Sequence, residues 1–99
     1  MTDAYDFTAT LWSTPSMATW VFVTLPQDIS DAIRAQPRPP RPGFGSIRVE
    51  VTLGGSQWST SIFPEASSRC YVLPVKRAIR TAEAVDVGDA VDVQLEVVE

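Results

Sequence analysis

The chain has 99 residues, enough for one domain with a core, and its 44% hydrophobic content is that of a folded protein rather than a disordered one. With no histidine and one cysteine, Cys70, the composition excludes a disulfide framework, the usual zinc and copper sites and His-dependent catalytic triads. Residues 1–7 lack the basic and apolar regions of a signal peptide, and no stretch approaches the ~18 apolar residues of a membrane span. We therefore expect a cytoplasmic protein, in a compartment that keeps Cys70 reduced, with no membrane partner.

The net charge of −4 is unevenly distributed along the chain. All eight basic residues lie between Arg34 and Arg80, together with two of the twelve acidic residues. Such asymmetry can mark an anion-binding face. The alternative is that the acidic end strands pair with the basic middle of the chain in the fold.

The first third of the chain predicts two strands and a helix. Residues 7–12 alternate apolar and polar side chains, which is typical of a half-buried strand. Residues 19–25 are β-branched and aromatic and predict a second, more buried strand. Pro26 ends this strand and suits the start of a helix, in which the apolar residues at helical spacing are Ile29, Ala32 and Ile33.

The segment 37–42, Pro-Arg-Pro-Pro-Arg-Pro, is incompatible with a helix or a central strand. We expect an extended polyproline II conformation there. This segment is either a basic tether over the barrel or a ligand for an SH3-type domain.

The rest of the chain predicts further strands and a second helix. Residues 47–53 alternate strictly, Gly54-Gly55 is a hairpin signal, and residues 57–63 return with Trp58, Thr60 and Ile62 on one face. A short strand at residues 71–73 leads to Pro74, which we expect to open a second helix. A turn at Gly88-Asp89 precedes a last strand at residues 91–97. The prediction is a mostly β fold of six to seven strands with two short helices, forming one domain over residues 1–99.

The sequence contains a weak internal echo. Val23-Thr24-Leu25-Pro26 leads into Ala32-Ile33-Arg34, and Tyr71-Val72-Leu73-Pro74 leads into Ala78-Ile79-Arg80 at a spacing two residues shorter. One supersecondary unit used twice predicts a small closed or split barrel with a pseudo-two-fold axis. The alternative is that the likeness is a coincidence.

Several segments together resemble a known family. They are residues 7–12, 20–26, 43–45, 58–64 and 71–76, followed by Ile79-Arg80 and residues 88–91. Their order and spacing are similar to those of the bacterial domain-of-unknown-function family 1905. The resemblance implies a small β-barrel related in shape to the swapped-hairpin barrels of AbrB- and MazE-like transcription factors, which bind DNA as dimers. It implies no catalytic residues, and this chain departs from the family pattern at Arg69-Cys70, where a glycine commonly precedes the tyrosine.

The start of the predicted second helix carries the main candidate site. Lys76 and Arg77 occupy its first turn, where the helix dipole disfavours cations by about 0.3–1 kcal/mol each. Arg80 falls on the same side of the helix. These three residues are the candidate anion-binding site, with Arg38 and Arg41 as additional candidates. The alternative is that Glu83, Asp86 or an acid of an end strand neutralises them.

A second candidate site is aromatic. Trp58 and Tyr71, joined by Trp20 and Trp12, are candidates to line a ligand cavity, because barrels can enclose one. The alternative is that these aromatic side chains belong to the core.

Our leading functional hypothesis is a non-enzymatic binding domain that recognises an anionic partner through the basic patch at Lys76, Arg77 and Arg80. Nucleic acid is one candidate partner and a protein is another. The alternative hypothesis is a barrel that binds or transforms an apolar small molecule in an aromatic-lined cavity. The sequence indicates no catalytic residue, no metal site and no cofactor.

Overall fold

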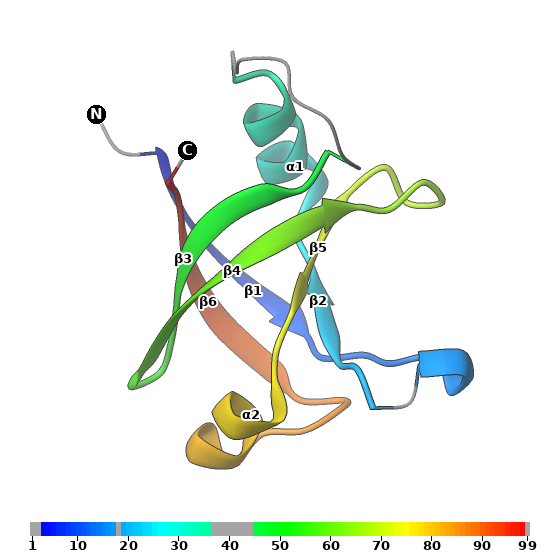
Figure 1. Ribbon diagram of the computed structural model, residues 1–99, viewed down its shortest axis with the longest axis vertical. Helices are drawn as coiled ribbons and strands as arrows, with labels where there is room; N and C mark the ends of the chain where they lie inside the picture. Colours follow the sequence, from blue (N-terminus) through cyan, green and yellow to red (C-terminus); the bar gives the residue numbers. More distant parts are fainter. Residues whose placement is uncertain (1–2, 18, 37–44, 99) are drawn as a thin grey trace.

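The computed structural model describes residues 3–17, 19–36 and 45–98. The predicted polyproline II segment at residues 37–42, with Arg38 and Arg41, lies outside the described residues. The predicted mostly β fold with two short helices is confirmed (Figure 1).

Six antiparallel strands form one sheet in the order β1-β6-β3-β4-β5-β2. Their bounds are β1 Asp3–Thr10, β2 Phe22–Thr24, β3 Ile47–Leu53, β4 Ser56–Pro64, β5 Tyr71–Pro74 and β6 Ala90–Val97. The β3–β4 hairpin turns at Gly54-Gly55, as its sequence predicts, and Gly54 has the positive φ of 60° that favours glycine. The chain ends of the described part lie side by side, because Asp3 pairs with Val97 (Figure 1).

The sheet curls until its two edge strands, β1 and β2, almost meet. Just beyond the end of β1, Trp12 and Phe22 exchange two backbone hydrogen bonds of 2.9 Å, each residue donating one. This bridge brings the open edges together and makes a nearly closed barrel. The second predicted strand is shorter than residues 19–25, because Thr19 and Trp20 are exposed and the regular ladder with β5 begins at Phe22.

Two short helices lie near opposite ends of the long axis of the molecule (Figure 1). They are α1, Gln27–Arg34, and α2, Arg77–Glu83, and a 3-10 turn at Pro15–Met17 lies between β1 and β2. No helix among the described residues is long and apolar enough to cross a membrane.

The prediction that Pro74 opens the second helix is wrong. Pro74 is the last residue of β5 and pairs with Phe22 of β2. The chain stays extended through Lys76 (φ −69°, ψ 157°), because the Val75 N–H donates to the Val21 carbonyl at 2.8 Å. The restricted φ of proline suits this extended backbone as well as a helix start, so the residue alone did not decide between them.

Apolar side chains from all six strands and both helices fill the interior of the barrel. The largest fully buried ones include Leu11, Leu25, Ile33, Ile62 and Leu73. Ser30 of α1 is the buried polar residue in this described core. Its hydroxyl accepts the Tyr71 N–H at 3.0 Å and lies 3.4 Å from the Leu25 carbonyl, so α1 is tied to β5 from within.

The pairing of the strands confirms the predicted pseudo-two-fold repeat. Strands β1 to β3 with α1 form one half, and β4 to β6 with α2 form the other. The echo aligns Thr24 with Val72, and these two residues are partners in the β2–β5 ladder. The other pairings follow the same symmetry: β1 lies on β6 as β4 lies on β3, and β3 lies on β6. The axis therefore passes between β2 and β5 and between β3 and β6.

Candidate functional site

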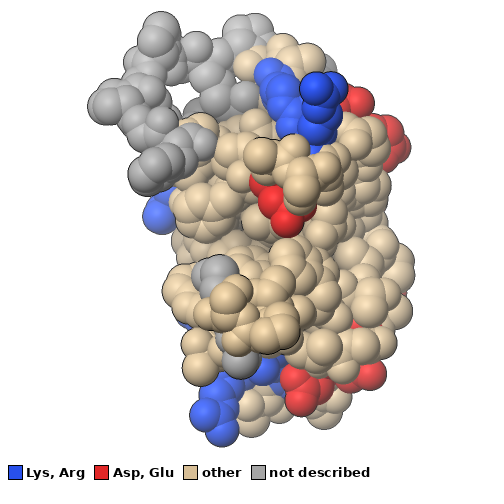
Figure 2. Space-filling view, turned by 90° about the vertical axis from the view of Figure 1, so that its right-hand side faces the viewer, with Lys and Arg blue, Asp and Glu red and all other residues tan. Residues whose placement is uncertain are grey.

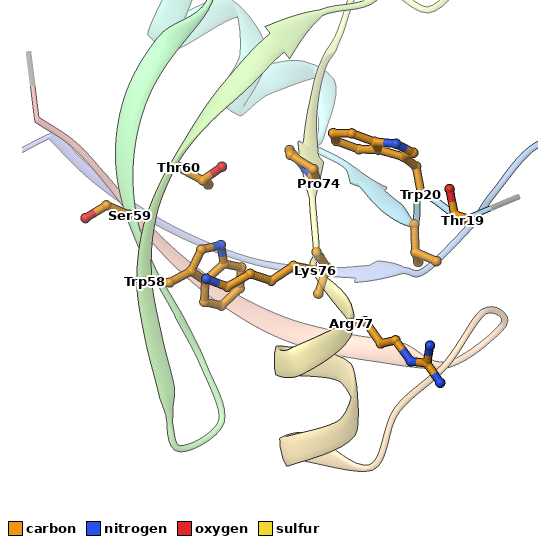
Figure 3. A pocket seen from close by; sticks show the side chains of 10 residues that line it. Thr19, Trp20, Trp58, Ser59, Thr60, Pro74, Lys76 and Arg77 are labelled. Carbon is orange, nitrogen blue, oxygen red and sulfur yellow. The ribbon is translucent and has the colours of Figure 1, made fainter. Parts of the chain in front are cut away.

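A groove of about 400 Å³ opens beside the start of α2. Three segments from three parts of the chain line it: Thr19–Val21, Trp58–Thr60 and Pro74–Arg77 (Figure 3). The sequence predicted a basic site and an aromatic site separately, and the structure places members of both in this one groove.

Trp20 forms one rim of the groove. Its side chain is 52% exposed, and its ring stacks on that of Phe22 with centroids 6.1 Å apart and planes 17° apart. Phe22 in turn packs against Trp12, with centroids 5.0 Å apart, and the Trp12 Nε1–H donates to the Thr24 hydroxyl at 2.8 Å. These contacts hold the apolar ring of Trp20 in a solvent-exposed position beside the groove.

Trp58 of β4 forms the inner, apolar part of the groove. Like Ile62 on the same strand, it is buried and faces inward, with 8% of its surface exposed. Pro74 and Val75 add apolar surface from the β5 side. Figure 3 shows the Lys76 side chain reaching toward Trp58, while the Arg77 side chain points away from Trp58.

Lys76 and Arg77 provide the charge. Lys76 is the N-cap residue of α2 and Arg77 its first residue, and both are exposed. Neither side chain makes an ion pair with any residue that the structure describes. Glu83 and Asp86, the two named acids that were candidates to neutralise the three predicted cations, form no ion pair with Lys76 or Arg77 in the described part of the chain.

Glu83 binds the β3–β4 turn. Its carboxylate accepts the Ser56 hydroxyl at 2.6 Å and the Gly55 N–H at 3.2 Å. Asp86 lies 3.7 Å from the guanidinium of Arg80, so the predicted alternative, neutralisation by Asp86, holds for Arg80. Neither acid is therefore placed to neutralise Lys76.

Arg80 does not line the groove. Its Nε–H donates to the Val75 carbonyl at 3.2 Å, and its side chain is 16% exposed. Of the three predicted cations, the structure brings Lys76 and Arg77 into the groove and uses Arg80 to brace the start of α2.

Tyr71 lies beside the other helix. It is buried, at 6% exposure, and the Arg34 guanidinium sits over its ring, 5.4 Å from the centroid. It is not among the residues that line the groove with Trp58. The two candidate cavity residues are therefore separated, one at each helix.

No acidic residue is among the described residues that line the groove. Asp6, Glu50 and Glu96 line a shallow hollow on strands β1, β3 and β6. No group of three or more potential metal ligands lies together among the described residues. On the face in Figure 2, basic and acidic side chains both lie toward the two ends of the long axis, and the middle is largely uncharged.

Sequence reasoning named Trp20 and Trp58 but not the groove that they share with Lys76. That neighbourhood depends on the pairing of β2 with β5, in which the Val75 N–H donates to the Val21 carbonyl. The internal echo was the available signal, because it implies that the two echoed strands meet at a two-fold axis.

These features define a class of protein: a small antiparallel barrel made of two similar halves, with a groove beside one helix. Residues 7–95 match the family described as Domain of unknown function (DUF1905), and the chain belongs to this family. The predicted resemblance is thereby confirmed. No curated protein matches the sequence, and the family description names no activity.

Proposed function

We propose that this protein is a non-enzymatic binding module that takes an anionic partner in the groove between Trp20, Trp58 and Lys76. One observation carries the proposal. Two exposed cations, without an ion-pair partner in the described part of the chain, line the same groove as two tryptophans.

The combination of charge and aromatic surface favours binding over a purely structural role. Cations that stabilise a fold are paired with acids or carbonyls, as Arg34 and Arg80 are here. Tryptophan and arginine are the side chains that most often contribute large binding energies at interfaces. Trp20, half exposed and held by its stack on Phe22, offers apolar contact area whose conformation is already fixed.

The proposal is tested with three anionic probes: anilinonaphthalene sulfonate, fluorescein-labelled oligothymidylate and a fluorescein-labelled octapeptide in which glutamate and valine alternate. We expect at least one of them to bind and to lose about fivefold or more in affinity on Lys76→Glu, since reversing one exposed charge removes an attraction and adds a repulsion. Arg69→Glu is the matched control, because Arg69 is exposed and lies at the α1 end of the molecule. If no probe distinguishes Lys76→Glu from Arg69→Glu, the proposal is wrong.

The predicted alternative was an apolar small molecule in a cavity lined by Trp58 and Tyr71, but these two side chains lie at different helices. The groove offers an apolar surface of another kind to the same class of ligand. The barrel interior is packed with side chains, whereas Trp20, Trp58 and Pro74 offer apolar surface from outside. The neutral dye phenylnaphthylamine separates the two functions, since it has the aromatic body of the sulfonate dye without its charge. Neutral dye that binds as tightly as the sulfonate, to wild type and Lys76→Glu alike, would favour the alternative.

The remaining parts of the proposal concern setting and partner class. A cytoplasmic location suits Cys70, a single buried thiol. The likeness in shape to DNA-binding swapped-hairpin barrels keeps nucleic acid among the probes but does not by itself assign DNA binding, since fold does not transfer function.

A further inference from the structure

We infer that the partner is an extended, acidic peptide segment of another protein that adds a strand to the free edge of β4. This inference rests on the proposed function, whose groove and cations it uses. It names the class of partner and the way in which that partner is held.

Among the residues that the structure describes, few pair with the edge of β4 that faces the groove. β4 runs from Ser56 to Pro64, and on the β3 side seven of its residues are paired without interruption. On the other side it pairs with β5 through Phe63 and Pro64. Towards the groove the two strands diverge, and Trp58, Ser59 and Thr60 line the space between β4 and Lys76.

The free edge presents backbone hydrogen-bonding groups to the groove. Backbone groups of alternate residues in a strand point to the same side. The Glu65 N–H donates to the Cys70 carbonyl on the β5 side, and the Gly55 N–H donates to Glu83 of α2 on the same side. The odd-numbered residues between them therefore direct their N–H and C=O groups away from β3. Ser59 is the one of these that lines the groove.

The side chains around this edge predict which kinds of residue the bound peptide contains. In a strand, successive side chains point to opposite faces, so a peptide on β4 would present every second residue inward. Inward residues would meet Trp58 and Pro74, which favours apolar side chains. The end of the groove holds Lys76 and Arg77, which favours glutamate or aspartate there. The expected pattern is an alternation of acidic and apolar residues.

The charges of the whole chain favour a short acidic peptide over a nucleic acid. Two cations in the groove match one or two carboxylates, whereas nucleic-acid binding draws its affinity from many phosphate contacts. A net charge of −4, with Asp6, Glu50 and Glu96 together on the β1–β3–β6 surface, would repel a long polyanion. A free small anion would leave the backbone groups of Ser59 unused.

The experiment measures how the full-length protein binds the alternating glutamate–valine octapeptide, by fluorescence polarisation. Two further versions carry N-methyl groups, one on the amides of the valines and one on those of the glutamates. Since valines must face inward, only one of the two sets of amides points at β4. We expect methylation of that set to weaken binding by about tenfold or more, as expected for the loss of one or two hydrogen bonds, and methylation of the other set to change it less than about threefold. A version with lysine in place of glutamate should not bind.

Each outcome of this experiment supports or overturns the inference, the proposed function or both. Unequal effects of the two methylations, together with weaker binding to Lys76→Glu than to Arg69→Glu, support the inference. Equal effects of the two methylations overturn strand addition, although Lys76-dependent binding would still support the proposed function. If oligothymidylate or anilinonaphthalene sulfonate binds in a Lys76-dependent way and the peptide does not bind, the inference of a peptide partner is wrong and the proposed anion-binding function is supported. If binding of none of these probes depends on Lys76, both are overturned.

Discussion

The two halves of the barrel treat the space beside their helices differently. Beside α1, the connection from β4 to β5 is bound to the helix: the Arg34 guanidinium donates to the Arg69 carbonyl at 2.6 Å, and the Cys70 thiol donates to Gln27 at 3.4 Å. Beside α2, the corresponding connection from β1 to β2 is longer and leaves a groove of about 400 Å³ in which Trp20 is half exposed. The same supersecondary unit is sealed at one end of the molecule and open at the other.

The echoed arginines show how this difference arises. Arg34 reaches across to the neighbouring loop, whereas Arg80 donates to Val75, a few residues before it in its own half. At the helix starts, α1 has Asp28 in its first turn, and α2 has Lys76 and Arg77. At the α1 end, the polar side chains of Arg34 and Gln27 thus stabilise the fold by binding the β4–β5 connection. At the α2 end, Lys76 and Arg77 have no ion-pair partner among the described residues.

The largest expected effect compares the two echoed isoleucines. Ile33 of α1 is fully buried and Ile79 of α2 is 8% exposed. We expect Ile33→Ala to lower the free energy of unfolding by about 3–5 kcal/mol and Ile79→Ala by about 2–3 kcal/mol, because truncation at a tightly enclosed site leaves the larger cavity. Urea denaturation of both variants measures the difference. Equal losses would show that the two ends are packed equally well.

A second prediction concerns the buried hydroxyl of α1. Ser30→Ala removes the acceptor of the Tyr71 N–H, and we expect a loss of about 1–3 kcal/mol for an unsatisfied buried donor. The matched control is Thr81→Ala, an exposed position in α2, where a change within about 0.5 kcal/mol is expected. Hydrogen exchange at the Tyr71 amide should accelerate in the first variant. Equal stability of the two variants would mean that Ser30 is not a tie between α1 and β5.

A third prediction concerns Glu83, the acid of α2 that binds the hairpin turn. Glu83→Ala should cost about 1–2 kcal/mol, because it removes the acceptor of Gly55 and Ser56. Gly54→Ala should also destabilise, since φ is positive there and the added methyl would meet the Glu83 carboxylate. The double variant should lose less than both single losses together, because removing Glu83 relieves that contact.

The same Glu83→Ala variant tests the role of this acid in binding. If Glu83 serves the turn and not the cations, the affinity of the bound anionic probe should change less than about twofold, since no attraction in the groove is altered. A several-fold rise in affinity would show that Glu83 screens Lys76, and the proposed comparison between the two ends would lose one of its grounds.

Local signals in the sequence predicted the strands whose partners are close in the chain. The alternation over residues 47–53 predicts which side chains of β3 face inward, and the Gly-Gly pair predicts the turn. Both signals come from neighbouring residues, so together they specify the β3–β4 hairpin almost completely. Pro74 was misplaced because its fixed φ fits an extended chain and a helix start equally. The strand around β2 was predicted too long. An aromatic residue such as Trp20 favours a strand prediction whether its side chain is buried or, as here, stacks on Phe22 outside the core.

The composition of the candidate site was only partly predictable. Lys76 and Arg77 stand out locally, as cations at a helix start. Which aromatic residue lies beside them depends on long-range strand pairing, and Trp58 and Tyr71 look alike in the sequence although they end up at different helices. The role of Arg80 was hidden for the same reason, because its partner Val75 is set by where the helix begins.

The smallest expected effect on stability belongs to the two cations of the groove. Lys76→Glu and Arg77→Glu remove no ion pair that the structure describes, so we expect no loss of stability. An acid at the start of a helix is favoured, and a gain of about 0.3–1 kcal/mol each at low salt is expected, smaller at high salt. Urea denaturation at two salt concentrations measures both effects. A loss above about 1 kcal/mol would show that these side chains support the fold.

A gain in stability combined with a loss of binding would separate the two ends of the molecule most clearly. Residues kept where folding disfavours them are typical of functional sites, because changes that stabilise a protein there tend to cost activity. At the α1 end, the buried Ser30 and Ile33 should show the opposite result, a large loss of stability with no effect on groove binding beyond that of unfolding. Lys76 and Arg77 would then be explained by the partner and not by the fold, and the open half of the barrel would be the half that binds.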